Sequence, residues 1–276
     1  MQCPYPVSIK NPAIEQHGGI LIGVQSDGNY LYEDGELVPG TILVPCGHCI
    51  ICQNARRDMW AARMQLENLD HVCGWFCTLT YDEDNCPPYL CRADLTKWLK
   101  RVRKRYQVRY FACGEYGSLG SRPHFHVILW FDTMLGQDDI DQLLNVTWTY
   151  GYTMAKPVNS DNMRYVAKYT VKEHLRTPPV FPAPYAVMSR RPGIAGPWFA
   201  SNSNYFKDYL ALPDGKHSPL PRYFLDKLDP VEQIQIKRHS REFAESLPVL
   251  SDTDKFIRLF NLERSVYRGY IRKYGK

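Results

Sequence analysis

The stretch Tyr110–Trp130, YFACGEYGSLGSRPHFHVILW, restricts the fold more than any other part of the chain. Two apolar runs flank a segment rich in Gly, Ser and Pro, which is the pattern of a β-hairpin. Because side chains alternate across a strand, His124 and His126 are expected to point to the same face. A hairpin that closes through Gly117–Pro123 would bring Glu115 of the first strand near both histidines.

Two histidines and a carboxylate in this arrangement could bind a divalent metal ion. Such a ligand set leaves coordination positions open, which suits a catalytic site better than a closed structural one. An isolated His-x-His pair, however, is more often part of a solvated strand face. A metal site therefore needs support from a second feature of the chain.

That feature is Tyr165–Lys172, YVAKYTVK, which has the pattern of a helix with Ser160–Asp161 as its N-cap pair. At about 100° per residue, an apolar side forms that comprises Met163, Val166, Ala167, Thr170 and Val171. Tyr165, Lys168, Tyr169 and Lys172 are expected on the opposite, polar side. A nearby ammonium favours the phenolate, so both tyrosines are candidate nucleophiles. The alternative is an ordinary amphipathic helix with surface Tyr and Lys side chains.

Together, the His-x-His strand and the Tyr-x-x-x-Tyr-x-x-Lys helix resemble the HUH superfamily of enzymes that nick and rejoin single-stranded DNA. The chain resembles most closely the replication initiators of gokushovirus-type microviruses, which are small single-stranded-DNA phages. The first motif of that family is similar to Phe76–Asp82 (FCTLTYD), and its metal motif to Arg122–His126 (RPHFH). Two flanking segments, Pro45–Cys52 (PCGHCIIC) and Met188–Gly193 (MSRRPG), also resemble the family. Several motifs in the same order are more specific than any one of them.

The resemblance implies a rolling-circle replication initiator. Glu115, His124 and His126 would hold Mg²⁺ or Mn²⁺. Tyr165 or Tyr169, with Lys168 and Lys172 nearby, would cut one strand and leave a 5′-phosphotyrosine link and a free 3′-hydroxyl. The implied partners are single-stranded DNA of the phage origin, a host helicase and a host DNA polymerase, and the implied location is the host bacterial cytoplasm.

Composition is compatible with this function and excludes others. The net charge of +5 permits nucleic-acid binding, although the distribution of charge matters more than the sum. No apolar run approaches the length of a membrane span, and the N-terminus lacks the apolar core of a secretion signal. No Walker-type phosphate loop is present, so neither helicase activity nor nucleotide hydrolysis is assigned.

The nine cysteines are expected to be reduced thiols or metal ligands, because no export signal accompanies them. Cys46, Cys49 and Cys52 follow one another at three-residue spacing and are candidate ligands of a structural Zn²⁺. His48 or a distant cysteine such as Cys73 or Cys77 could supply a fourth ligand. The alternative is a turn with packed thiols.

Basic side chains collect on two predicted helices. Asn54–Leu69 is expected to expose Arg56, Arg57 and Arg63. A second helix, with Asp94 as N-cap and Tyr106 near its end, has an apolar stripe and a basic surface without acids. Like charges at this density repel one another unless a polyanion neutralises them.

These features define a set of predicted DNA-binding residues. Thr78 and Thr80 belong to the strand expected over Trp75–Tyr81, which the resemblance places beside the metal hairpin. The aromatic pair Trp198 and Phe199, close to the RRPG segment (190–193), could hold bases. The full set of predicted DNA-binding residues is Thr78, Thr80, Lys100, Arg101, Arg103, Lys104, Arg105, Arg122, Arg190 and Arg191.

From Trp75 the predicted order is strand, helix, hairpin, helix, strand, helix. This order favours an α+β fold, an HUH endonuclease-like antiparallel or mixed β-sheet with helices packed on it, plus N- and C-terminal extensions. The expected division is residues 1–72 (a β segment, the cysteines and a basic helix), 73–176 (the nicking core) and 177–276 (a Pro-rich strap and basic helices).

Two other functions compete with the initiator. One is a transposase or relaxase of the same superfamily. The other is a zinc-stabilised nucleic-acid-binding protein without catalysis, which would bind zinc but form no covalent link to DNA.

Overall fold

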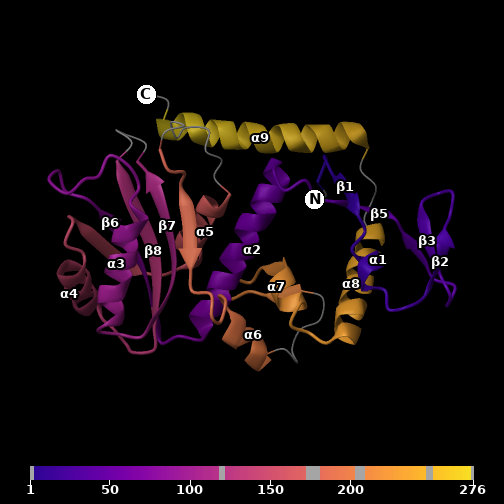
Figure 1. Cartoon of the computed structure of the whole chain (residues 1–276). Coiled ribbons are helices and arrows are strands. Elements are labelled where there is room, and N and C mark those ends of the chain that lie inside the picture. The colour runs from indigo at the N-terminus through magenta and orange to yellow at the C-terminus, as the bar shows by residue number, and fades with distance from the viewer. Residues whose placement is uncertain (1–2, 118–121, 172–180, 203–208, 247–250, 275–276) are drawn as a thin grey trace. The chain divides into compact units, whose positions relative to one another are not determined.

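The computed structural model describes residues 3–117, 122–171, 181–202, 209–246 and 251–274 (Figure 1). The chain divides into two compact units, Met1–Ala55 with Leu250–Tyr270, and Arg56–Val249 with Ile271–Lys276. This division differs from the expected boundaries at 72 and 176. Long-range packing groups the helix that ends at Leu69, and most of the segment after 177, with the central sheet.

The larger unit is built on a five-stranded sheet in the order β10-β7-β8-β6-β9. Its strands are β6 (Cys73–Thr80), β7 (Val108–Tyr116), β8 (Pro123–Phe131), β9 (Thr153–Pro157) and β10 (Tyr185–Met188). Every neighbouring pair is antiparallel. The predicted hairpin is the β7–β8 pair, although most of its turn lies outside the described residues. The predicted α+β fold class is confirmed, as is the order of elements from strand β6 onward.

Helices cover both faces of this sheet (Figure 1). On one face, α3 (Arg92–Arg103) and α4 (Gln137–Thr147) pack on side chains that include Leu79, Phe125 and Val127. On the other face, α2 (Ile50–Leu69) and α5 (Ser160–Ala167) pack on Phe111 and Ile128. Burying each large apolar side chain stabilises the fold by about 1.5–3 kcal/mol. The alternation along the strands thus builds two separate apolar layers.

Two helix starts differ from their predicted positions. The N-cap of α3 is Cys91, and Asp94 instead accepts a hydrogen bond from the Tyr81 hydroxyl at 3.1 Å. The N-cap of α5 is Asn159, whose side chain accepts from the backbone N–H of Asn162 at 2.9 Å. Asn is as good an N-cap as Ser, so side-chain preference alone does not decide between neighbouring candidates.

The rest of the larger unit forms a small apolar cluster next to α2. It contains α6 (Gly196–Asn202), β11 (Tyr209–Ala211), β12 (His217–Pro219) and α7 (Arg222–Leu225), followed by α8 (Pro230–Ser246). The rings of Phe199 and Phe224 stack with centroids 4.5 Å apart, and Leu66 of α2 belongs to the same cluster. The predicted helix start near Asp229-Pro230 is confirmed.

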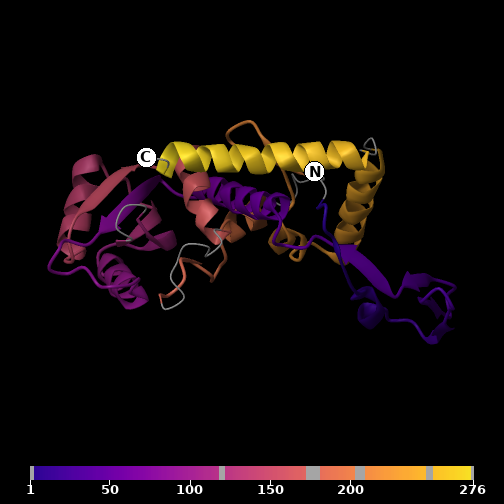
Figure 2. The same cartoon turned by 90° about the horizontal axis from the view of Figure 1, so that it is seen from above.

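The smaller unit contains two separate sheets (Figures 1 and 2). Strand β1 (Val7–Lys10) pairs with β5 (Thr41–Val44), while β2 (Leu21–Val24), β3 (Asn29–Tyr32) and β4 (Leu37–Pro39) form the other sheet. The short helix α1 (Ala13–Gln16) is tied to β3, because the Tyr32 hydroxyl donates to the Ile14 carbonyl at 3.1 Å. Most of α9 (Asp252–Tyr274), which begins where predicted, also belongs to this unit. No described helix is both long and apolar enough to cross a membrane.

Candidate active site and metal centre

Strands β7 and β8 bring two imidazoles and a carboxylate together. Glu115 lies directly opposite His124 in the strand register. The Nε2 atoms of His124 and His126 each lie 3.0 Å from Oε1 of Glu115. Glu115 is 5% exposed and His126 is 8% exposed. The three predicted metal residues therefore form one partly buried cluster, whose ligand atoms all lie within 4.8 Å of one another.

Both imidazoles are oriented by hydrogen bonds through their other nitrogen atoms. Nδ1 of His124 lies 3.2 Å from the Arg122 carbonyl oxygen, and Nδ1 of His126 lies 3.1 Å from the Thr78 hydroxyl. A carbonyl can only accept, so Nδ1 of His124 carries the proton and Nε2 keeps its lone pair. This pattern of outer hydrogen bonds is typical of histidines that bind metals.

The two tyrosines reach the same carboxylate oxygen. The hydroxyl of Tyr169 donates to Oε1 of Glu115 at 2.6 Å, and that of Tyr165 lies 3.3 Å from the same atom. The two hydroxyls are 2.8 Å apart. Both phenols and both imidazoles thus converge on one oxygen atom of Glu115.

The position of Tyr169 corrects the expectation of two tyrosines on a polar helix face. Helix α5 ends at Ala167 and continues as the 3₁₀ turn η1 (Lys168–Thr170), and Tyr169 is only 4% exposed. It packs in the same apolar layer as Val166. Lys168 is exposed, and Lys172 lies outside the described residues.

The surroundings keep both phenols neutral. Burial raises the pKa of Tyr165 to about 12, and the nearby charge of Glu115 acts in the same direction. Burial, followed by the charge of Glu115, raises the pKa of Tyr169 well above its usual range. A carboxylate beside a phenol disfavours the phenolate, so any cation that neutralises Glu115 would lower both pKa values.

The predicted threonines lie on strand β6 next to this cluster. Thr78 pairs in register with His126, and Thr80 with His124. The Thr80 hydroxyl donates to the Tyr152 carbonyl at 3.2 Å. Thr78 therefore touches a metal residue, whereas Thr80 only faces the same side of the sheet.

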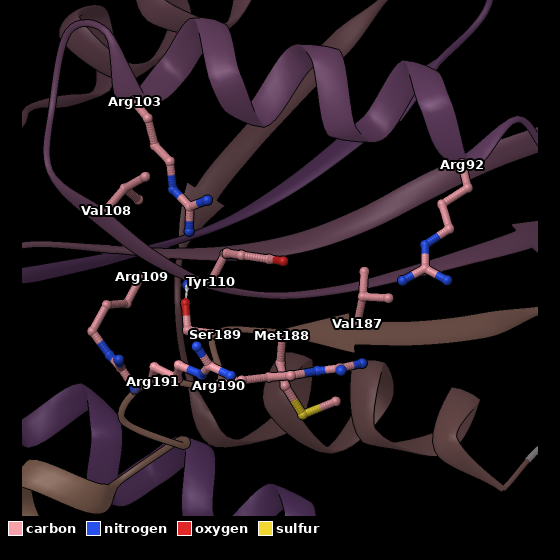
Figure 3. Close-up of a pocket in the computed structure, with 10 residues that line it drawn as sticks. All are labelled: Arg92, Arg103, Val108, Arg109, Tyr110, Val187, Met188, Ser189, Arg190 and Arg191. Atoms are coloured by element: carbon pink, nitrogen blue, oxygen red, sulfur yellow. Dashed lines mark hydrogen bonds between the residues drawn. The ribbon is translucent and has the colours of Figure 1, made fainter.

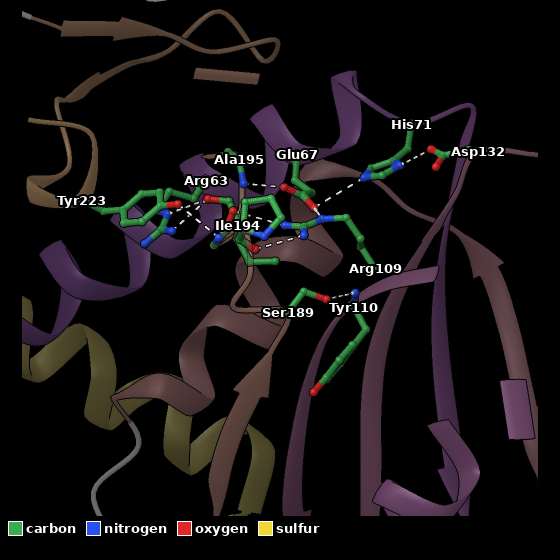
Figure 4. A network of polar contacts seen from close by, with 12 residues as sticks. Arg63, Glu67, His71, Arg109, Tyr110, Asp132, Ser189, Ile194, Ala195 and Tyr223 are labelled. Atoms are coloured by element: carbon green, nitrogen blue, oxygen red, sulfur yellow. Dashed lines mark hydrogen bonds and ion pairs between the residues drawn. The ribbon is translucent and has the colours of Figure 1, made fainter. Parts of the chain in front are cut away.

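A buried network holds the RRPG segment against α2 (Figure 4). Glu67 of α2 accepts hydrogen bonds from the Arg109 guanidinium and from the backbone N–H of Ala195. Arg109 also donates to the carbonyls of Pro192 and Gly193, at 3.0 and 3.2 Å. No sequence pattern indicates a role of Glu67 beyond its place on a helix.

Arg63 was expected to be exposed but belongs to this network. Its guanidinium is buried and donates twice to the Ile194 carbonyl, at 3.1 and 2.8 Å. Burial lowers the pKa of Arg63 to about 10, so the side chain remains charged at neutral pH. Long side chains such as Arg can pack their stems in an apolar cluster while the head finds an acceptor.

Glu67→Gln is expected to destabilise the larger unit by about 3 kcal/mol near pH 6, because Arg109 loses its buried partner. Burial raises the pKa of Glu67, but hydrogen bonds from His71, Arg109 and Ala195 outweigh it, so the pKa is lowered. Burial lowers the pKa of His71, but its bonds to Glu67 and Asp132 outweigh it, so the pKa is raised.

The pH dependence of this effect follows from the two directions. The contribution of Glu67 is lost as pH falls below about 4.3, and that of His71 is lost as pH rises above about 6.5. Urea unfolding of the wild type and of Glu67→Gln at pH 4, 6 and 8 measures the difference, with the exposed Glu83→Gln as control. A difference independent of pH would contradict the network.

The network places two arginines of the RRPG segment at a pocket of about 580 Å³ at the edge of the sheet (Figure 3). Arg103 stacks over the Tyr110 ring at 5.2 Å and Arg92 over the Tyr185 ring at 5.7 Å. Within the described part of the chain, no carboxylate forms an ion pair with Arg92 or Arg103. The pocket is lined by Arg92, Arg103, Val108, Arg109, Tyr110, Val187, Met188, Ser189, Arg190 and Arg191.

The other predicted DNA-binding residues lie apart from this pocket. Helix α3 packs on the face opposite the tyrosines, where Lys100, Lys104 and Arg105 are exposed. Arg101 is partly buried, with its guanidinium 5.4 Å from the Tyr150 ring. Phe199 is buried in an apolar cluster, so the prediction that it holds bases is wrong.

Four cysteines of the smaller unit form a second cluster. Cys3, Cys46, Cys49 and Cys52 place their sulfur atoms within 4.8 Å of one another. Sequence spacing identified the last three, but the fourth member is Cys3 rather than His48, Cys73 or Cys77. Cys77 is fully buried in the sheet of the larger unit.

The comparisons with known proteins indicate the class of protein. Residues 74–174, which include the hairpin and both tyrosines, match a family of replication-associated proteins of the ORF2 type. The chain is thus similar to replication-associated proteins over the part of the larger unit that carries the candidate active site.

Individual relatives refine this class. Replication-associated protein VP4 of Bdellovibrio phage phiMH2K is 26% identical, and the alignment covers 91% of this chain and 89% of the relative. Replication-associated protein ORF2 of Spiroplasma virus 4 is 27% identical over 52% of this chain and 50% of the relative. Replication-associated protein ORF4 of Chlamydia phage 1 is 24% identical over 47% and 38%. These matches confirm the resemblance to the replication initiators of gokushovirus-type microviruses.

Among solved structures, the hypothetical protein ORF119 from Sulfolobus islandicus rod-shaped virus 1 is 13% identical. The match covers 42% of this chain and 97% of that chain, with a TM-score of 0.30. A similarity at this level carries no conclusion about the fold or its function.

Proposed function

We propose that the protein is a rolling-circle replication initiator that nicks and rejoins single-stranded DNA at a phage origin through a tyrosine. The observation that carries the proposal is the convergence of Tyr165, Tyr169, His124 and His126 on Glu115. The relatives named replication-associated proteins support the role in replication. In a phage infection this reaction would take place in the host bacterial cytoplasm.

The donor set fits Mg²⁺ or Mn²⁺. Two imidazole nitrogens with free lone pairs and one carboxylate oxygen lie close enough to share one ion, and they leave positions for other ligands. Bound there, the cation would polarise the scissile phosphate and offset the negative charge of Glu115. His124, His126 and Glu115 are the residues that would hold it.

The chain's own residues supply the nucleophile and its position. A phenol oxygen of Tyr165 or Tyr169, having lost its proton, attacks the phosphorus atom. The new O–P bond forms as the bond from phosphorus to the 3′ oxygen breaks, and that oxygen takes up one proton. The products are a 5′-phosphotyrosine and a free 3′-hydroxyl.

One ester replaces another in this step. The number of phosphate ester bonds is therefore conserved, so the reaction needs no nucleotide hydrolysis and can run backwards to join strands. This matches the lack of a Walker-type loop in the sequence. The free 3′-hydroxyl would serve a host polymerase, and a host helicase would separate the strands.

The arginine pocket would bind a part of the DNA other than the scissile phosphate. Tyr110 at the pocket and Glu115 at the metal cluster lie five residues apart on β7. At about 3.3 Å per residue, the two sites are separated by about 17 Å. Guanidinium groups recognise phosphates through paired hydrogen bonds, so the pocket suits the DNA backbone.

Replacing Arg92, Arg103, Arg190 and Arg191 together by Gln is expected to weaken single-stranded DNA binding and to reduce its salt dependence. Each phosphate contact contributes about −0.7 to the slope of log K against log salt concentration, so the slope should fall by about two to three units. Fluorescence anisotropy at several salt concentrations measures it.

The matched control removes four charges from the surface of α3 and its end, outside the pocket. Lys97, Lys100, Lys104 and Arg105 are all exposed. Their replacement by Gln should change the slope by less than about one unit. Equal effects of the two quadruple variants would show that the pocket has no special role.

The proposed function itself is tested with circular single-stranded phage DNA and Mn²⁺. A protein–DNA band that survives denaturing electrophoresis, and that disappears with chelator, is the expected result. Binding without any covalent band would favour the non-catalytic nucleic-acid-binding protein. Cutting confined to transposon-end hairpins would favour a transposase.

A further inference from the structure

We propose that Cys3, Cys46, Cys49 and Cys52 bind one structural Zn²⁺ through four thiolates, with Cys3 as the fourth ligand. The cluster lies wholly in the smaller unit. The proposal is independent of the nicking reaction, because none of these residues belongs to the unit that contains the tyrosines.

The distances between the sulfur atoms fit a zinc tetrahedron. A Zn–S bond of about 2.3 Å places two sulfurs of a tetrahedral site about 3.8 Å apart. The sulfurs of Cys3 and Cys49 are 3.8 Å apart, and those of Cys46 and Cys52 are 4.0 Å apart. Both distances are far longer than the ~2.05 Å of a disulfide bond. The four thiols are therefore arranged around a common centre rather than in bonded pairs.

The backbone around the cluster is built for thiolates. The N–H of Cys49 donates to the sulfur of Cys46 at 3.3 Å, and the N–H of Cys46 donates to the sulfur of Cys3 at 3.3 Å. Hydrogen bonds of this kind stabilise the negative charge on a metal-bound sulfur. Gly47 adopts φ of 79°, a left-handed conformation that glycine accepts readily, and so lets the chain turn between Cys46 and Cys49.

Other candidates for the fourth ligand are excluded by their positions. His48 is exposed and takes no part in the cluster. The thiol of Cys73 donates to the Thr133 carbonyl at 3.3 Å in the larger unit. Cys3 is the described residue that completes the set, and it comes from a segment 43 residues before Cys46.

A four-thiolate zinc site would stabilise a unit that has little apolar core. In the described part of Met1–Ala55, the buried apolar residues are Tyr32 and Val38, while much of β1 and β2 is exposed. Small units of this kind often depend on a metal for folding. The site would fasten the segment before β1 to the end of β5 and to the start of α2.

X-ray absorption at the zinc edge of the purified full-length protein tests the ligand set without any mutation. One zinc per chain with four sulfur neighbours at about 2.3 Å is expected. Absence of zinc after expression in zinc-supplemented medium would overturn the proposal. A shell of three sulfurs and one nitrogen would also overturn it, because it would replace Cys3 by a histidine.

Cys3→Ser then tests the assignment of the fourth ligand. Its zinc affinity should fall at least tenfold, and Co²⁺ bound in its place should show weaker thiolate-to-cobalt charge-transfer absorption. Cys86→Ser, a partly buried thiol outside the cluster, is the matched control and should behave as the wild type. An unchanged cobalt spectrum and zinc affinity in Cys3→Ser would contradict the assignment.

Discussion

The double variant Tyr165→Phe/Tyr169→Phe is expected to form no covalent DNA adduct, whereas each single variant forms some. Both hydroxyls reach Oε1 of Glu115 and lie 2.8 Å from each other. Either phenol can therefore attack the same phosphate after a small rearrangement. Phe keeps the ring packing, so the change removes the nucleophile without opening a cavity.

The two single variants should differ. Tyr165 is the more exposed phenol, whereas Tyr169 is buried and held by Glu115. We therefore expect Tyr165 to form most of the first adduct. Tyr169→Phe removes one hydrogen bond to Tyr165, worth about 1 kcal/mol, so its first adduct should form within about fivefold of the wild-type rate.

Sustained production of circles should need both tyrosines. In a replication cycle, one tyrosine holds the displaced 5′ end while the other cuts the regenerated origin. The new 3′-hydroxyl then attacks the first phosphotyrosine and closes the circle. Each single variant should accordingly release few circles after its first turnover.

Denaturing gels for the adduct and for labelled circular product measure these outcomes. Tyr152→Phe is the matched control, because this tyrosine is 71% exposed and takes no part in the cluster. If Tyr165→Phe sustains full multiple-turnover circle production while Tyr169→Phe forms no adduct, Tyr169 is the only nucleophile. Any adduct in the double variant would remove both tyrosines from the mechanism.

The parts of the site that the sequence predicted depend on local periodicity. Alternation along two strands joined by a short turn placed His124, His126 and Glu115 together, and the register pairs Glu115 with His124 as expected. Hydrophobic patterning likewise predicted helix α3 and its buried stripe. Such features need no knowledge of distant segments.

The features that were missed depend on contacts between distant segments. Cys3 meets Cys46 across 43 residues, and Glu67 meets Ala195 across 128. The arginine pocket joins the two ends of α3 to the RRPG segment. No local pattern reports such pairings, and an exposed arginine looks the same in sequence as the buried Arg63.

The burial of Tyr169 was missed for a different reason. A helix that continued past Ala167 at 100° per residue would turn Tyr169 toward the polar side. The change to a 3₁₀ turn alters this angle, because a 3₁₀ helix has three residues per turn. Where a helix changes its winding, periodicity counted from its start no longer gives the direction of a side chain.

His124→Ala, His126→Ala and Glu115→Gln are each expected to reduce nicking by at least about 100-fold at limiting Mn²⁺. Loss of a hydrogen-bond partner of a metal ligand alone costs about 10- to 100-fold in metal affinity or activity, and loss of a ligand should cost more. DNA binding should remain, since the arginine pocket lies about 17 Å away along β7. Nicking rates across a Mn²⁺ titration, with anisotropy for DNA binding, separate the two effects.

His217→Ala is the control, because His217 is exposed and distant in sequence from the cluster. Nicking by the His124→Ala/His126→Ala variant in the presence of chelator would overturn the metal assignment. Thr78→Val extends the test, since the Thr78 hydroxyl contacts Nδ1 of His126. It should raise the Mn²⁺ concentration needed for half-maximal nicking while the rate at saturating Mn²⁺ recovers, because Thr78 orients a ligand and does not itself bind the ion. A rate that stays low at saturating Mn²⁺ would instead place Thr78 in contact with the DNA.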